Sequence, residues 1–190
     1  YSSDGERNGG SVDGESRGGV VSMSTAGSRT GFGSLEDYVK GDLEIINDNP
    51  KYYAFSNVFE VADKSAPYEK VVVALNLGYV LETLRAEGQS PWFAASHDEF
   101  AVVLDGQVRV DLVKLADPDK WAAPDKQGTV KLPGEPVGKT MGYIKASRGH
   151  QVLLPKGAAY RFDAREPGVI LMQTILGDLS VQKWSEICYK

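Results

Sequence analysis

Two short β-rich motifs, at residues 96–110 and 149–162, constrain the fold of this chain more than any other feature. In the first motif an apolar strand leads into Asp105-Gly106, and a second strand alternates apolar and polar residues after it. Asp-Gly between two such strands predicts a hairpin, because glycine accepts the positive φ of a tight turn. In the second motif a short apolar strand ends in Pro155-Lys156-Gly157, which predicts a turn before the next strand.

Other segments rich in Val, Tyr and Thr recur along the chain with turn residues between them, which is typical of an all-β sandwich or barrel. The predicted strands outside the first motif cover residues 52–61, 70–75, 78–85, 143–146, 151–154, 160–164 and 169–176.

Two short helices and one long loop complete the predicted elements. Ser34 is a candidate N-cap for a helix that ends at Gly41, and residues 181–187 predict a C-terminal helix. Residues 116–140 contain four Pro and three Gly, which predicts a loop. Such a loop is either a solvated excursion or a subunit contact made through Trp121.

The N-terminal 33 residues differ in composition from the rest. They contain nine Gly and seven Ser and no apolar period, so we expect a tail that is disordered unless a partner holds it, followed by a single domain at residues 34–190. Met23-Ser24-Thr25 has the form of a natural start. It remains open whether residues 1–22 are an added extension.

Composition excludes several function classes. The net charge of −5 and the pI near 5.1 provide no basic surface for nucleic acid. The longest apolar runs are strand-sized, well short of the roughly 20 residues that cross a bilayer, so no membrane segment is expected. Cys188 is the one cysteine and cannot form an intramolecular disulfide. No signal peptide is recognisable, and we expect a cytoplasmic protein.

The two motifs resemble those of the cupin superfamily. Its first motif carries two His spaced H-x-H, then a Glu, then the hairpin Gly; its second reads Gly, five residues, Pro-x-Gly, two residues, His. Glu99 and Gly106 match the end of the first motif, and Gly149, Pro155 and Gly157 match the second. The resemblance implies an all-β, cupin-type jelly-roll β-barrel, here with short N-terminal and C-terminal helices.

The metal ligands of these motifs are mostly replaced. An iron or zinc site needs imidazole nitrogens and carboxylate oxygens that converge on one point. The positions of the imidazoles hold Trp92 or Phe93, Ala94 or Ala95, and Tyr160. Glu99 alone remains, which predicts a cupin that keeps the barrel and has no metal.

Three segments, at residues 49–58, 90–101 and 179–188, are similar to the small subunit of two-component hydroquinone 1,2-dioxygenases, over roughly residues 35–188. The resemblance implies a non-catalytic chain in a cytoplasmic α2β2 heterotetramer. Its larger cupin partner would bind Fe(II) and use O2 to open the ring of an aromatic diol, giving a semialdehyde. The chain would stabilise that partner and help to complete its pocket.

Two alternatives stay open. One is a stand-alone metal-dependent cupin enzyme with a shifted site made of His97, Glu99 and His150. His97 and Glu99 share one face of a strand, whereas Asp98 points to the other. The second alternative is a metal-free cupin that binds a small ligand through Tyr160. If neither applies, Glu99 is a buried carboxylate that must find hydrogen-bond partners inside the barrel.

Four residues are therefore candidates for a substrate pocket or an interface: Trp92, Phe93, His97 and Tyr160. Trp92 and Phe93 could wall an aromatic pocket of the partner or anchor the interface, since Trp is enriched among interface anchors. Tyr160 either donates a hydrogen bond to a ligand or fills the volume of the missing imidazole.

Overall fold

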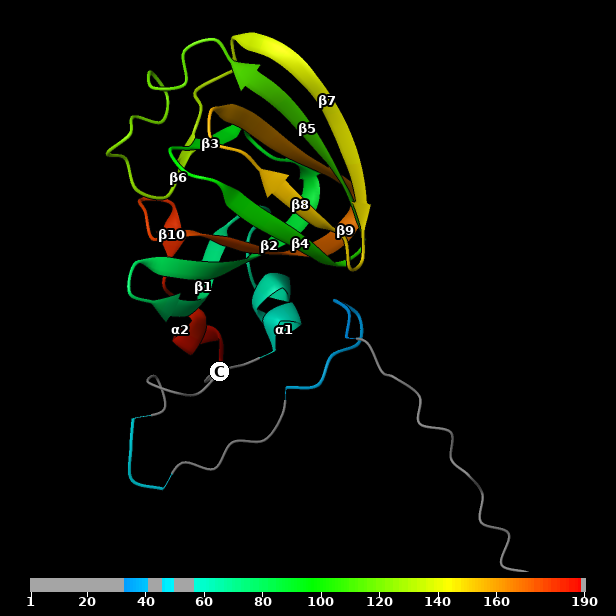
Figure 1. Cartoon of the computed structure of the whole chain (residues 1–190). Helices are drawn as coiled ribbons and strands as arrows, with labels where there is room; N and C mark the ends of the chain where they lie inside the picture. The colour runs from blue at the N-terminus through cyan, green and yellow to red at the C-terminus, as the bar shows by residue number, and fades with distance from the viewer. Residues whose placement is uncertain (1–32, 41–45, 50–56, 189–190) are drawn as a thin grey trace, which may run out of the picture. The chain divides into compact units, whose positions relative to one another are not determined.

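The computed structural model describes residues 33–40, 46–49 and 57–188 (Figure 1). These residues belong to one compact unit, Phe32–Lys190. The predicted tail lies outside them except for Gly33. The described elements are α1 (Val58–Asp63), β1 (Lys70–Asn76), β2 (Tyr79–Gln89), β3 (Phe93–Ala95), β4 (Glu99–Asp105), β5 (Gln107–Leu115), β6 (Thr129–Lys131), β7 (Gly138–Ser147), β8 (Gln151–Leu154), β9 (Ala158–Ile175), β10 (Ser180–Val181) and α2 (Trp184–Cys188).

The strand β9 joins two sheets because its two halves have different neighbours. Its first half pairs with β3, β5 and the end of β2, and its second half with the rest of β2 and with β4, all antiparallel. One sheet therefore has the order β10-β1-β2-β9-β4-β8, and the other β6-β3-β9-β5-β7. This arrangement is the predicted cupin-type jelly roll. The predicted strands at 160–164 and 169–176 are one strand in the structure.

The hairpin between β4 and β5 is confirmed at Asp105-Gly106, where Gly106 has a φ of 74°. This turn lies against the middle of β9. A Cβ on Gly168 would lie 2.6 Å from the carbonyl oxygen of Asp105, so only glycine allows β9 to run this close to the hairpin. Gly157, in the second motif, also has a positive φ, of 80°.

The N-terminal helix lies elsewhere than predicted. Ser34 Oγ accepts the N–H of Asp37 at 3.0 Å, as an N-cap would, but the described residues 33–40 form only a local turn. Gly41 and residues 52–56 lie outside the described residues. The helix is α1, in the last part of the segment predicted as a strand. Asn57 caps it by accepting the N–H of Phe59 at 3.0 Å.

The predicted loop at 116–140 is shorter than expected. Most of its residues are exposed, part of it packs on the sheet, and a subunit contact through Trp121 stays a prediction. It contains β6 and the beginning of β7, and its Trp121 packs against a small apolar cluster on the outside of β3. The C-terminal helix begins at Trp184 because Ser180 and Val181 pair with β1 instead.

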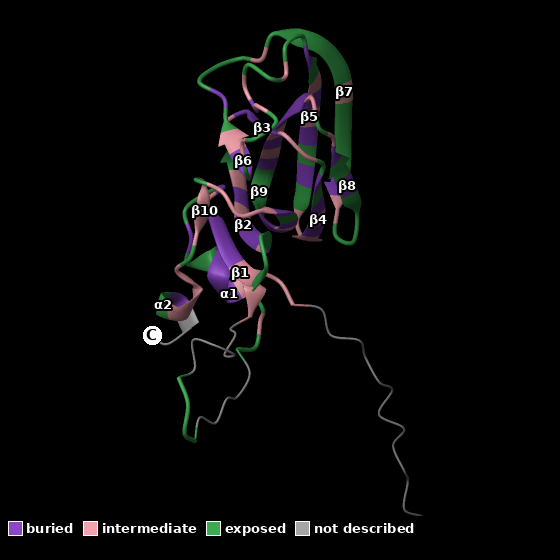
Figure 2. Ribbon diagram, turned by 60° about the vertical axis from the view of Figure 1, so that its left-hand side comes forward, coloured by how far each residue is buried: buried purple, intermediate pink, exposed green. Residues whose placement is uncertain are grey.

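Three apolar clusters hold these layers together. The main core lies between the two sheets, and its largest fully buried side chains include Leu84, Leu154, Tyr160, Phe162, Ile170 and Met172. A second cluster lies under the 116–137 segment, and a third joins Val61 of α1, Val71 of β1 and Ile187 of α2. The two helices lie beside β1, away from the loop between β5 and β6 (Figure 1). Figure 2 shows β7 exposed along most of its length.

We expect Gly168→Ala to lower the free energy of unfolding by about 1–3 kcal/mol, because the added methyl group overlaps the backbone of the hairpin. Gly134→Ala is the matched control, since a Cβ there meets nothing within 4 Å; its effect should stay within about 1 kcal/mol. Urea denaturation of both variants measures the difference. Equal stability of the two variants would contradict the close approach.

Candidate functional site

The interior of the barrel holds a carboxylate, Glu99, where a cupin would place a metal ligand. Glu99 opens β4 and is fully buried. Its Oε1 accepts the hydroxyl groups of Thr129 at 2.5 Å and Thr174 at 2.6 Å, and its Oε2 accepts the phenol of Tyr160 at 2.6 Å. A buried carboxylate is costly without such partners, and here both oxygens have hydroxyl donors.

The fold brings these donors together from three strands. Thr129 lies on β6, whereas Tyr160 and Thr174 come from the two halves of β9. The Tyr160 ring packs at 5.8 Å from Phe93 and at 5.4 Å from Phe162. Burial, and after it the Glu99 carboxylate, raises the pKa of Tyr160 well above its ordinary value. The phenol therefore stays protonated and acts as a donor.

His97 lies at the edge of this network. Its Nε2 is 2.9 Å from Thr174 Oγ1 and 3.9 Å from Glu99 Oε1. Because the Thr174 hydroxyl donates to Glu99, His97 donates its Nε2–H to Thr174. Asp98 points away and accepts the backbone N–H of Lys156 at 2.8 Å. The predicted alternation of the two faces is confirmed.

A second buried charge pair, Lys70 and Glu82, lies in the same interior. Lys70 Nζ is 3.6 Å from Glu82 Oε2 and donates to Met172 Sδ at 3.1 Å, while Ser180 Oγ donates to Glu82 Oε1 at 2.6 Å. Burial raises the pKa of Glu82, and Lys70 opposes this shift. Sequence reasoning missed the pair, although Glu82 shares its strand face with the apolar Val80 and Leu84.

His150 does not join His97 and Glu99. It lies in the exposed turn between β7 and β8, where its Nδ1 lies 2.9 Å from the carbonyl oxygen and 3.2 Å from the backbone nitrogen of Ser147. Its carbonyl oxygen accepts the N–H of Val103, which is four residues, or about 13 Å, along β4 from Glu99. Within residues 33–40, 46–49 and 57–188 no group of three His, Cys, Asp or Glu side chains could hold a metal ion.

Trp92 and Phe93 lie on opposite sides of their sheet rather than as one projecting pair. Phe93 is inside the barrel and Trp92 outside, and only 4% and 7% of these residues is exposed. The indole Nε1–H of Trp92 donates to Glu135 at 2.9 Å, and the Arg161 guanidinium lies 4.4 Å from the centre of its ring.

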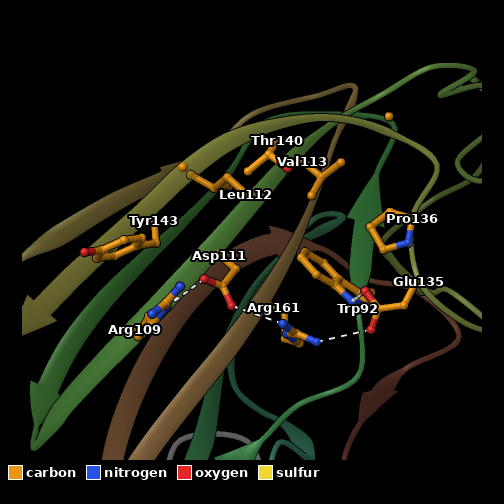
Figure 3. Close-up of a pocket in the computed structure, with 12 residues that line it drawn as sticks. Trp92, Arg109, Asp111, Leu112, Val113, Glu135, Pro136, Thr140, Tyr143 and Arg161 are labelled. Carbon is orange, nitrogen blue, oxygen red and sulfur yellow. Dashed lines mark hydrogen bonds and ion pairs between the residues drawn. The ribbon is translucent and has the colours of Figure 1, made fainter.

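Trp92 also lines a surface pocket of about 330 Å³ between β5, β7, β9 and the segment that precedes β7. Figure 3 shows Arg161 between Asp111 and Glu135, to which it is joined by ion pairs of 3.2 and 3.3 Å. Nearby, the Arg109 guanidinium lies 4.0 Å from the centre of the Tyr143 ring. Of these pocket residues, the sequence indicated Trp92 alone. Arg161, Asp111 and Glu135 are far apart in the sequence, so no local motif pointed to them.

We expect Tyr160→Phe to lower the free energy of unfolding by about 1–3 kcal/mol, because Glu99 Oε2 loses its phenol donor while it stays buried. Tyr143→Phe removes the same hydroxyl group from a ring that is 55% exposed, and should change stability by no more than about 0.5 kcal/mol. Urea denaturation at neutral pH compares them. Unchanged stability of Tyr160→Phe would show that the phenol does not support Glu99.

Comparison with known proteins places this fold in a specific enzyme family. No protein-family model and no curated protein sequence matches the chain. A chain in the crystal structure of hydroquinone 1,2-dioxygenase PnpCD with Cd2+ and 4-hydroxybenzonitrile is 60% identical, with a TM-score of 0.81 over 88% of this chain and 100% of that chain.

A second structure agrees with the first. A chain of hydroquinone 1,2-dioxygenase from Sphingomonas sp. TTNP3, with 4-hydroxybenzoate bound, is 52% identical, with a TM-score of 0.81 over 86% of this chain and 98% of that chain. A chain in the structure of PnpCD with Fe3+ shares the fold, with 10% identity and a TM-score of 0.52 over 76% of this chain and 40% of that chain. The identities and the near-complete coverage show that the present chain belongs to the hydroquinone 1,2-dioxygenase family, as a dioxygenase subunit with the cupin fold.

Proposed function

We propose that this chain is the small, non-catalytic subunit of a heteromeric, Fe(II)-dependent hydroquinone 1,2-dioxygenase. The observation that carries the proposal is the match to PnpCD: one PnpCD chain is matched over its whole length at 60% identity. A second PnpCD chain has the same fold but is covered over only 40% of its length. That second chain is roughly twice as long as this one, and it is the kind of partner that the proposal requires.

The donor set around Glu99 supports this division of roles. A non-haem iron site needs imidazole and carboxylate ligands with open positions. Here the Glu99 oxygens accept hydroxyl groups, and the nearest imidazole, His97, is directed at Thr174. These residues do not fit an iron site, so we assign the iron to the larger subunit.

In the proposed enzyme, ring opening of an aromatic diol with O2 takes place at Fe(II) held by the larger subunit. This chain stabilises that subunit in an α2β2 heterotetramer.

A single cysteine fits a cytoplasmic location, where disulfides are rare. No helix in the described part of the chain is long and apolar enough to span a bilayer.

Of the four candidate residues, Trp92 is the one that we propose to act toward the partner. Phe93, His97 and Tyr160 line or fill the barrel interior, whereas Trp92 borders an open surface pocket. An indole held by Glu135 and stacked on Arg161 is a rigid aromatic surface. Such a surface can anchor a subunit contact or wall a partner's aromatic pocket.

We expect the chain expressed alone to retain far less than one iron per chain after dialysis and to show no ring cleavage. Mixed with the larger subunit, it should give an active complex whose iron follows the larger chain when the subunits are separated. Elemental analysis of each separated subunit, together with O2 consumption with hydroquinone, measures both. About one equivalent of iron in the isolated chain would contradict the proposal and restore the stand-alone enzyme.

We expect Trp92→Ala to weaken assembly or lower turnover of the complex about tenfold, a change of about 1.4 kcal/mol. Titration of the larger subunit and steady-state kinetics separate the two effects. Trp92→Phe keeps an aromatic ring but loses the N–H bond to Glu135 and the second ring of the indole, so it should recover part of the loss. If Trp92→Ala is folded and changes neither assembly nor turnover, Trp92 has no role toward the partner.

A further inference from the structure

The outward-facing side of β2, the second half of β9, β4 and β8 forms a continuous surface, named here the apolar face. Pairing places Leu81 opposite Gln173, Gln173 opposite Phe100, and Phe100 opposite Leu153, so one row of side chains crosses all four strands. Residues that pair across neighbouring strands point to the same face of a sheet. The strand pairing therefore also gives the residues in the two rows next to this one. The apolar face consists of Tyr79, Leu81, Phe100, Val102, Gln151, Leu153, Leu171, Gln173 and Ile175. Thr83, opposite Leu171, is buried, and the exposed Asp98 borders the face beside Phe100.

The composition of this surface is unusual for exposed residues. Tyr79 is 59% exposed, Leu153 47% and Phe100 37%. None of the nine residues is charged, although 25% of the whole chain is. The outward side of β5 and β7 is an internal comparison, because it carries Arg109, Asp111 and Lys145 at equivalent positions. Depletion of charge distinguishes the centre of a protein interface from ordinary surface.

Two other outward surfaces of the sheets have a cover, whereas the outward side of β5 and β7 is uncovered and carries charged residues. Helices α1 and α2 pack on β1 through the cluster that contains Val61 and Ile187. The 116–137 segment packs on β3 through the cluster that contains Trp92 and Leu132. The apolar face has no such layer among the described residues. Met141, Tyr143 and Ile144 of β7 are exposed as well, but they lie beside the charged Arg109, Asp111 and Lys145.

We propose that the apolar face is the docking surface for the larger cupin-type chain of the dioxygenase; this inference rests on the proposed function. Nine positions, spaced about 4.8 Å between strands and about 6.8 Å along them, give about 300 Å². Two copies of this chain joined through that area alone would bury about 600 Å², below the roughly 1,200 Å² of stable interfaces. A chain roughly twice as long can cover the face and continue past its edges.

Leu153→Lys, measured against the larger chain of PnpCD, tests the proposal. The substitution places a charge in the middle row of the docking surface, and we expect at least tenfold weaker binding by titration calorimetry or analytical ultracentrifugation. Phe100→Lys should act alike. Met141→Lys, on β7 and 52% exposed, is the matched control and should bind like the wild-type chain. Thermal unfolding of each free variant confirms that all are folded.

The outcomes separate this inference from the proposed function. If the wild-type chain does not bind the larger chain, the proposed function fails. If the wild-type chain binds and folded Leu153→Lys and Phe100→Lys bind equally well, the proposed function stands and the docking surface is wrong. If the free chain is a dimer that Leu153→Lys dissociates while binding to the larger chain is unchanged, the occupant is a second copy and the inference is overturned.

Discussion

The buried carboxylate of Glu99 is the interaction on which the rest of the barrel depends. A carboxyl group without exposed surface needs hydrogen-bond partners, and its donors come from β6 and from both halves of β9. The network therefore joins the two sheets at the position where a cupin metal would join them. Three hydroxyl donors compensate the carboxylate here, in the place where a cation would do so in a metal-binding cupin.

The same interior contains Lys70 and Glu82, whose charges lie among apolar side chains of the main core. Glu99 is among the groups that raise the pKa of Glu82, so the two carboxylates influence each other across the barrel. Removing one member of such a buried ion pair lowers the free energy of unfolding by more than the intact pair contributes to it, because the remaining charge stays buried. Substitutions in this polar interior therefore destabilise the barrel, whereas residues on its outer surface tolerate substitution more readily.

The sequence predicted the turns, because the backbone conformation of a few adjacent residues determines them. Asp105-Gly106 and Pro155-Lys156-Gly157 specify turns by backbone conformation, and both turns form where expected. The position of the first helix was wrong because Ser34 and Asn57 offer similar caps, and the choice depends on Val61 packing against Val71 and Ile187. The second motif's Tyr160 was identified as a substituted ligand position, but its donors and neighbours were not, because Thr129 and Thr174 reach Glu99 only through long-range pairing.

The two proposed contact surfaces lie on the outer sides of different sheets. The Trp92 pocket is outside the sheet that contains β5 and β7, whereas the apolar face is outside the sheet that contains β4 and β8. The main core separates them, so a single compact partner domain cannot lie flat on both. Contact at both surfaces therefore needs two partner domains, which either one larger chain or two such chains can supply, because the larger chain is roughly twice as long as this one.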